Sequence, residues 1–279
     1  QHDPGELSPA HRADVWGDES EAINRALEWA RSRVVRPSNA KTTARPASTL
    51  ADAVGDVITP GGIGADEAMR IFSDILEPAT RAQDDPLNLA YIPAAPTGAA
   101  VAFDTVVSSA NIFGGLWESG AGAIFAENQV LAWLANLLGW DADRAGGVFV
   151  SGGTIGNLSA LTAARARAAA TRSRPIRGWQ IACSAGAHSS IDAAARVMDV
   201  DVLRVPQDEL GHLTAEALRD SVSDPSRLFA VVASAGTTNA GVIDDLSGLG
   251  EVCRDNGVWL HVDGAYGGAG IVSPTLRPQ

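Results

Sequence analysis

The sequence predicts an α/β fold in which a mostly parallel sheet is flanked by helices and preceded by a helical N-terminal segment. Short apolar runs alternate with amphipathic stretches after residue 146, at the spacing of strand–helix units. Glycines, hydroxyl groups and a carboxylate follow several of these runs. Helical periodicity without strand-like runs dominates the first part of the chain. We therefore place a helical segment at residues 1–105 and the large domain at residues 106–279.

The strands and helices of the large domain can be assigned from this alternation. Strands are expected at Val148–Val150, Trp179–Cys183, Val200–Val205, Leu228–Ala233 and Val258–Val262. Helices are expected at Ile155–Thr171, Ser190–Met198, Thr214–Ser223 and Leu246–Asn256, with a further helix before the first strand at Glu127–Leu138. Near-continuous apolar strands indicate a sheet that is covered on both faces.

The N-terminal segment is expected to hold two helices. The first covers Asp18–Arg33, and the second covers Ala65–Gln83 with a break near Pro78. Between them, the Pro-, Ser- and Thr-rich stretch Pro37–Ser48 is typical of a linker.

Composition excludes several classes of function. The 279 residues carry a net charge of −12, which argues against binding to nucleic-acid phosphates. No run of 18 apolar residues and no signal peptide is found, so we expect a cytoplasmic protein without membrane contact. Cys183 and Cys253 are expected to be reduced, buried thiols, and no Cys/His cluster has metal-ligand spacing.

Ligands of an open α/β sheet bind at the carboxyl ends of its strands, and four such ends carry unusual residues. They are Ser151–Asn157, Ala187–Ser190, Ser234–Gly241 and Leu260–Gly268. The glycines and Thr154 of the first cluster open a helix, where free N–H groups can hold an anion such as phosphate. Taken alone, that cluster is equally a plain strand–helix turn.

The other clusters are also ambiguous when each is taken alone. His188 is as readily a structural histidine, next to serines that can cap a helix, and the third cluster is as readily a loop of capping residues. Asp263 follows a hydrophobic strand, where a buried carboxylate is costly unless it is paired with a cation. A protonated heterocyclic nitrogen would be a suitable partner.

Together the four clusters resemble the group II pyridoxal-phosphate-dependent amino-acid decarboxylases, which include glutamate, cysteine-sulfinate, diaminobutyrate and aromatic amino-acid decarboxylases. The resemblance extends over roughly residues 90–279, includes the stretch Trp117–Trp140, and is loose before residue 85. It implies a fold-type-I, aspartate aminotransferase-like domain, of which the C-terminal part is missing. It also implies pyridoxal 5'-phosphate as cofactor and decarboxylation of an L-amino acid to its amine and CO₂.

The resemblance assigns roles to individual residues. His188 would stack on the pyridine ring, and Asp263 would pair with the ring nitrogen. The residues implied to contact the cofactor are Gly153, Thr154, Asn157, His188, Thr237, Asp263 and Ala265. His188 and Asp263 are the implied catalytic residues, and His261 is implied to support the site. Ile155 stands where many members of the family have a glutamate, although the glutamate and cysteine-sulfinate decarboxylases also have an aliphatic residue there. Gly264 stands where an alanine is usual.

The family also uses a lysine as an internal Schiff base, and that lysine has no counterpart here. The only lysine, Lys41, lies in the predicted linker and fits no such motif. We expect a complementary C-terminal chain to supply it, in a dimer of such pairs, and this chain alone to be inactive. A piece of a longer protein and a non-catalytic subunit are the alternatives.

A pyridoxal-phosphate-dependent carbon–carbon lyase is the alternative reaction, although the Gly-Gly-Thr-Ile-Gly-Asn and Gly-Thr-Thr-Asn-Ala-Gly segments fit the decarboxylases better. The substrate does not follow from the sequence. Tyr91, Ile92, Pro93 and Trp117 are as readily core residues as pocket residues, and His2, His11 and His212 are expected at the surface.

Overall fold

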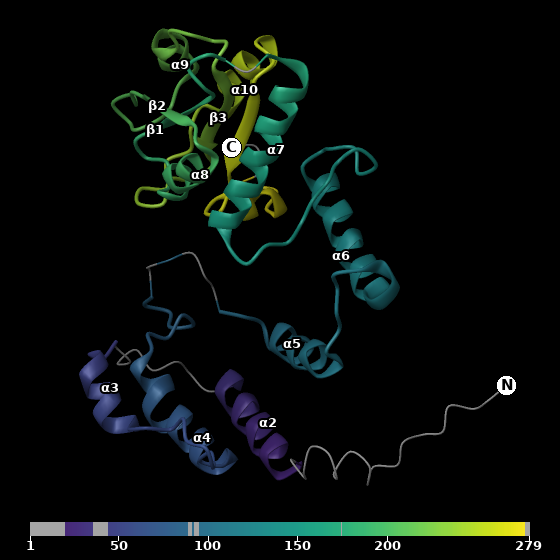
Figure 1. Ribbon diagram of the computed structural model, residues 1–279, viewed down its shortest axis with the longest axis vertical. Coiled ribbons are helices and arrows are strands. Elements are labelled where there is room, and N and C mark those ends of the chain that lie inside the picture. The colour runs from purple at the N-terminus through teal and green to yellow at the C-terminus, as the bar shows by residue number, and fades with distance from the viewer. Residues whose placement is uncertain (1–19, 36–43, 89–90, 92–94, 174, 277–279) are drawn as a thin grey trace, which may run out of the picture. The chain divides into compact units, whose positions relative to one another are not determined.

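The structure is a computed structural model that describes residues 20–35, 44–88, 91, 95–173 and 175–276 (Figure 1). The chain divides into two compact units, Gln1–Phe113 and Gly114–Gln279, and each is described here by itself. The domain boundary after residue 105 stays a prediction. Lys41, His2, His11, Ile92 and Pro93 lie outside the described residues.

The first unit is helical, as the sequence predicted. Its helices are α2 (Ser20–Val35), α3 (Ala47–Val54), α4 (Ala65–Ile71) and α5 (Gly98–Ala110). After α4 the chain continues as a π-helical turn and a 3-10 turn that contains Pro78, which accounts for the predicted break. The linker prediction was wrong at its end, because α3 begins at Ala47, directly after Pro46.

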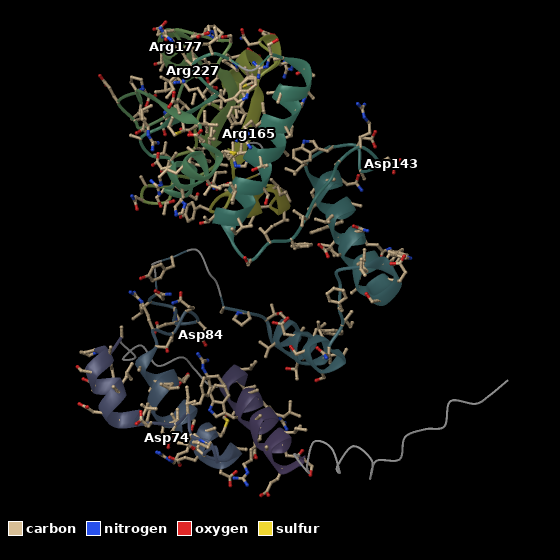
Figure 2. All side chains as sticks on the ribbon, viewed as in Figure 1. Asp74, Asp84, Asp143, Arg165, Arg177 and Arg227 are labelled. Carbon is tan, nitrogen blue, oxygen red and sulfur yellow. The ribbon has the colours of Figure 1, made fainter. Side chains whose placement is uncertain are left out.

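An arginine and an aromatic pair hold the first unit together. Arg33 of α2 donates to Glu77 at 2.8 Å and to both oxygens of Asp84 at 2.6 and 2.8 Å (Figure 2 labels Asp84). The hydrogen bonds to Asp84 raise the pKa of the Arg33 guanidinium above its ordinary value. Trp29 packs edge-on against Phe72 with ring centroids 5.0 Å apart.

The second unit contains a fully parallel sheet of four strands in the order β2-β1-β3-β4. The strands are β1 (Gln180–Ser184), β2 (Asp201–Val205), β3 (Leu228–Ser234) and β4 (Trp259–Asp263). Each coincides with a predicted apolar run to within a few residues. β1 and β3 lie in the centre, and every residue of β3 is buried.

Helices cover both faces of this sheet (Figure 1). On one face, α7 (Gly153–Thr171) and α8 (Ser190–Met198) pack against Ile181, Cys183 and Phe229. On the other face lie α9 (Ala215–Ser221) and α10 (Leu246–Asp255). They pack against the strand side chains that point the opposite way, such as Ala182, which lies between Ile181 and Cys183 in β1. Arg165 of α7 donates to the carbonyl of Met198 at 2.6 Å and joins the two helices of the first face (Figure 2).

Both cysteines are buried, as expected. Burial raises the pKa of Cys183 and of Cys253 to about 11, so both thiols are protonated at neutral pH. Within the described ranges, no helix combines the length and the apolar character that a membrane span requires.

The strand predicted at Val148–Val150 is absent, and this prediction was wrong. Its residues belong to no strand and are 37–64% exposed. A strand needs a neighbour for its N–H and C=O groups, and in the described part of the chain none lies beside this run. The helix before it, α6 (Trp117–Leu137), begins ten residues earlier than predicted, across a kink at Gly120.

Candidate active site

The predicted site residues gather where α7 begins, at the carboxyl ends of β1, β3 and β4. Asp263 is the last residue of β4, and its carbonyl accepts the N–H of Ala235, one residue past β3. The N–H of Gly267 then returns to the carbonyl of Ala235 at 2.9 Å. The loops after these two parallel strands are therefore tied together beside the start of α7.

Asn157, one turn into α7, lies at the centre of the polar contacts. It is only 7% exposed. Its Nδ2 lies 2.9 Å from Asp263 Oδ2 and 2.9 Å from Ser190 Oγ, and its Oδ1 lies 2.8 Å from His261 Nε2. Both amide N–H groups and the amide oxygen are thus engaged with protein atoms. Asn157 therefore positions the side chains of Asp263, Ser190 and His261.

The Asp263 carboxylate is fixed at both of its oxygens. Oδ2 accepts from Asn157, and Oδ1 accepts the backbone N–H of Ala265 at 3.1 Å. The side chain is only partly buried, so a ligand can reach it. A fixed, accessible carboxylate at this edge of the sheet is suited to a cationic partner.

His188 is exposed and is held from one side only. Its Nδ1 lies 2.8 Å from Ser190 Oγ and 3.2 Å from the N–H of Ser190. Ser189 occupies the N-cap position of α8 but makes no side-chain capping bond, so capping was the wrong expectation for these serines. Ser190 instead connects His188 to Asn157, a role that no local sequence pattern indicates.

The start of α7 carries backbone N–H groups that are suited to an anion. The first N–H groups of a helix, here those of Gly153 and Thr154, cannot be satisfied within the helix, and they carry the positive end of its dipole. Thr154 is exposed. A Cβ built on Gly153 would lie 4.0 Å from the Cβ of Ala265, so the start of α7 adjoins the loop that follows Asp263.

Thr237 is buried and shapes the loop after β3. Its backbone N–H donates to the Val242 carbonyl at 2.9 Å, and its Oγ1 accepts the N–H of Val242 at 3.1 Å. Its methyl group lies 3.2 Å from the Cβ position of Gly186, in the loop that leads to His188. The adjacent Thr238 is exposed. Thr237 therefore packs the loop after β3 against the loop that leads to His188.

Gly236 is required by this loop. Its φ of +99° is unfavourable for other residues, and an added Cβ would lie 2.6 Å from Tyr266 Cδ1. Gly236→Ala is expected to reduce the free energy of unfolding by about 1–3 kcal/mol, measured by urea denaturation. Gly178→Ala is the control, because Gly178 has a φ of +79° and nothing within 4 Å of its Cβ position. An equal loss in the two variants would show that the Tyr266 contact is unimportant.

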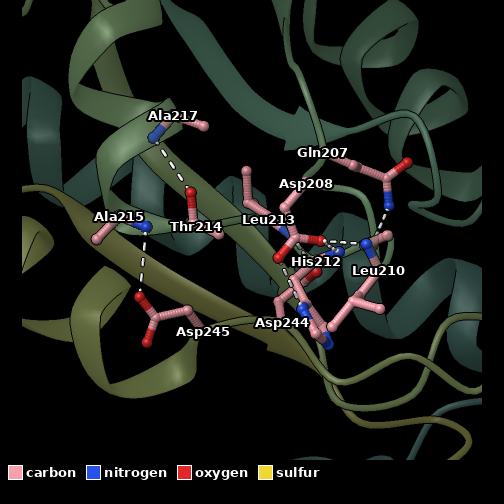
Figure 3. Close-up of polar contacts among 11 residues, drawn as sticks. Gln207, Asp208, Leu210, His212, Leu213, Thr214, Ala215, Ala217, Asp244 and Asp245 are labelled. Carbon is pink, nitrogen blue, oxygen red and sulfur yellow. Dashed lines mark hydrogen bonds and ion pairs between the residues drawn. The ribbon is translucent and has the colours of Figure 1, made fainter.

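Asp244 lies near Leu213 and Asp208 (Figure 3) and joins the end of β3 to the segment before α9. Its two oxygens accept the backbone N–H groups of Leu213 and Ser234, both at 2.7 Å. Near it, Asp208 accepts from the backbone and Nδ1 of His212, and these bonds lower the Asp208 pKa. His212 is half-exposed, in keeping with its expected surface position.

Burial raises the pKa of Asp244 above its ordinary value of 3.8. Because the folded protein then holds this proton to higher pH than the unfolded chain, the contribution of Asp244 to stability falls as pH rises above 3.8. We expect the stability advantage of the wild type over Asp244→Asn to shrink with rising pH in that window. Urea denaturation at a series of pH values measures it, and a constant difference would contradict the prediction.

Comparison with known proteins identifies the family of this chain. Residues 63–279 match the family described as "Pyridoxal-dependent decarboxylase conserved domain". The chain belongs to this family. The resemblance proposed from the four clusters is thus confirmed, and pyridoxal phosphate is the cofactor of the family.

Individual relatives include an aromatic-L-amino-acid decarboxylase of Bacillus atrophaeus, 36% identical over 197 residues that cover 68% of this chain and 40% of the relative. A Rhodiola rosea 4-hydroxyphenylacetaldehyde synthase structure superposes with a TM-score of 0.78 at 23% identity, over 99% of this chain and 61% of that one. A second structure is the glutamate decarboxylase domain of diaminobutyrate-pyruvate transaminase and L-2,4-diaminobutyrate decarboxylase from Vibrio parahaemolyticus. It superposes with a TM-score of 0.74 at 25% identity, over 99% of this chain and 62% of that one. These structures confirm the predicted fold class. The chain spans less than half the length of the curated relatives it matches.

The residues present fit pyridoxal phosphate. A helix N-terminus suits its phosphate, and the fixed carboxylate of Asp263 suits its ring nitrogen. His188 lies in the loop after β1 and Ala265 in the loop after β4, and both residues are exposed.

Proposed function

We propose that this protein decarboxylates an L-amino acid to the corresponding amine and CO₂ with pyridoxal phosphate. The observation that carries this proposal is the Asp263 carboxylate, held by Asn157 and by the Ala265 N–H next to the free N-terminus of α7. Bound pyridoxal phosphate would supply an electron sink for the charge that remains when CO₂ leaves.

Different residues of this chain would bind different parts of the cofactor. The N–H groups of Gly153 and Thr154, with the Thr154 hydroxyl, would bind its phosphate. Asp263 would accept a hydrogen bond from the ring nitrogen and keep a proton there, which strengthens electron withdrawal. His188 and Ala265 would contact opposite faces of the ring, and Thr237 would shape the loop beside it.

The remaining roles concern the binding of the substrate carboxylate and the positioning of Asp263. His188 has one ring nitrogen engaged by Ser190, which leaves the other free to donate to the substrate carboxylate. Because both oxygens of Asp263 are already positioned, little reorganisation is needed when charge develops.

A Schiff-base lysine must come from outside residues 1–279, because Lys41 fits no lysine motif of the family. We propose that a complementary chain supplies it, with a dimer of such pairs as the active form in the cytoplasm. Mass spectrometry of an active preparation tests this part. An active preparation that contains one polypeptide would contradict a second chain and leave the reaction itself unaffected.

The reaction is tested with this protein combined with its complementary chain, pyridoxal phosphate and a panel of amino acids that includes aromatic amino acids, histidine, glutamate and 2,4-diaminobutyrate. With both chains present, we expect the absorbance band of bound pyridoxal phosphate. We also expect release of CO₂ and amine in equal amounts from one class of substrate. An aldehyde product from a carbon–carbon cleavage would favour the lyase alternative, and cofactor binding without turnover of any substrate would favour a non-catalytic subunit.

A further inference from the structure

We infer that a relay of four side chains, His261–Asn157–Ser190–His188, holds His188 in one neutral tautomer with its proton on Nε2. Asn157, Ser190 and His261 are then positioning residues for His188. The functional part of this inference rests on the proposed decarboxylation, whereas the tautomer itself is a property of the protein alone.

The direction of the relay is set at Asp263. An aspartate carboxylate only accepts hydrogen bonds, so the Asn157 group 2.9 Å from Asp263 Oδ2 is the amide NH₂. The same nitrogen lies 2.9 Å from Ser190 Oγ, and its second hydrogen is donated there. The amide oxygen of Asn157 is consequently directed toward His261.

His261 completes the fixed end of the relay. Its Nε2 lies 2.8 Å from Asn157 Oδ1, an acceptor, so Nε2 carries a proton and donates it. Burial lowers the pKa of His261, and the ring is therefore neutral, with no proton on Nδ1. A neutral Nε2–H histidine at this position locks the orientation of the Asn157 amide.

Ser190 passes this orientation to His188. Because Ser190 Oγ already accepts from Asn157, its own hydrogen is free to point to His188 Nδ1, 2.8 Å away. The backbone N–H of Ser190 points to the same nitrogen at 3.2 Å. Two donors directed at Nδ1 require a lone pair there, so the proton of the neutral ring lies on Nε2.

The consequence is that one amide, Asn157, orients both groups on which the reaction depends. Its NH₂ holds the Asp263 carboxylate and, through Ser190, makes the free side of His188 a hydrogen-bond donor. A donor on that side can bind a substrate carboxylate, whereas the other tautomer would present a lone pair to the same carboxylate and repel it.

Long-range ¹H–¹⁵N NMR of protein with ¹⁵N-labelled histidine tests the relay directly. The protein has five histidines, and the His188 signals are assigned by their loss in His188→Gln. We expect a protonated Nε2 and an unprotonated Nδ1 for His188. In Ser190→Ala a mixture of tautomers is expected, and Ser190→Thr, which keeps the hydroxyl, should restore the wild-type signals. Ser189→Ala is the matched control, since the neighbouring Ser189 makes no side-chain cap bond.

Protonation of His188 on Nδ1 in the wild type, or identical signals in Ser190→Ala, would overturn the relay. In the active enzyme, Ser190→Ala should lower kcat about tenfold, the loss that one ordinary hydrogen bond implies, and Ser190→Thr should recover it. An altered tautomer with unchanged kcat would overturn the positioning role. Absence of turnover in the wild type combined with its complementary chain would count against the proposed function, while the NMR result would still decide the relay.

Discussion

Asp263→Asn is expected to lower the rate of decarboxylation about 100-fold or more and to weaken the binding of pyridoxal phosphate. The magnitude is that observed when one preorganised electrostatic partner is removed from an active site. An asparagine can still contact Asn157, but it carries no charge to keep a proton on the ring nitrogen of the cofactor. Steady-state kinetics and titration of the cofactor absorbance measure the two effects.

The control for this variant is Asp220→Asn, which removes an exposed carboxylate at the end of α9. It should leave cofactor binding and kcat unchanged. Full cofactor affinity and full kcat in Asp263→Asn would show that the ring nitrogen has another partner, and the proposed binding mode would be wrong.

Phe229→Ala is expected to cost about 3–5 kcal/mol of the free energy of unfolding, the range for a large-to-small change in a core. Phe229 is 1% exposed in the central strand β3, and its ring lies edge-on to Trp179 with centroids 6.2 Å apart. Its removal leaves a cavity between the sheet and the helices α7 and α8.

Chemical denaturation monitored by tryptophan fluorescence measures this loss. Phe125→Ala makes the same chemical change on α6 at a side chain that is 56% exposed, and we expect a change within about 0.5 kcal/mol. Equal losses in the two variants would mean that the β3 core does not dominate the stability of the second unit.

The sheet could be predicted because each strand is an apolar run with no competing helical period. Leu228–Ala233 is the clearest example, and it is buried throughout. Val148–Val150 has the same composition but did not form a strand, because pairing depends on a neighbour and not on the run itself. Helix α5 was missed because Gly98–Ala110 has only one charged residue, and none of its residues is buried against a partner.

For the site, the motifs predicted the residue types but not their contacts. Asp263 and His188 were identified by their places after two strands. The function of Ser190 and the central place of Asn157 depend on partners 33 and 106 residues away, which no local pattern contains. Thr237 was expected close to the cofactor, and its bonds to Val242 are a feature of the loop that only coordinates reveal.

The bond between Asn157 and Asp263 also has a consequence for biosynthesis. It joins the first turns of α7 to the end of β4, 106 residues later, so the site cannot exist until β4 has been made and has joined the sheet. During synthesis, α7, α8, β1 and β3 can already bury their shared core. Capture of pyridoxal phosphate would therefore be one of the last events in the folding of this unit.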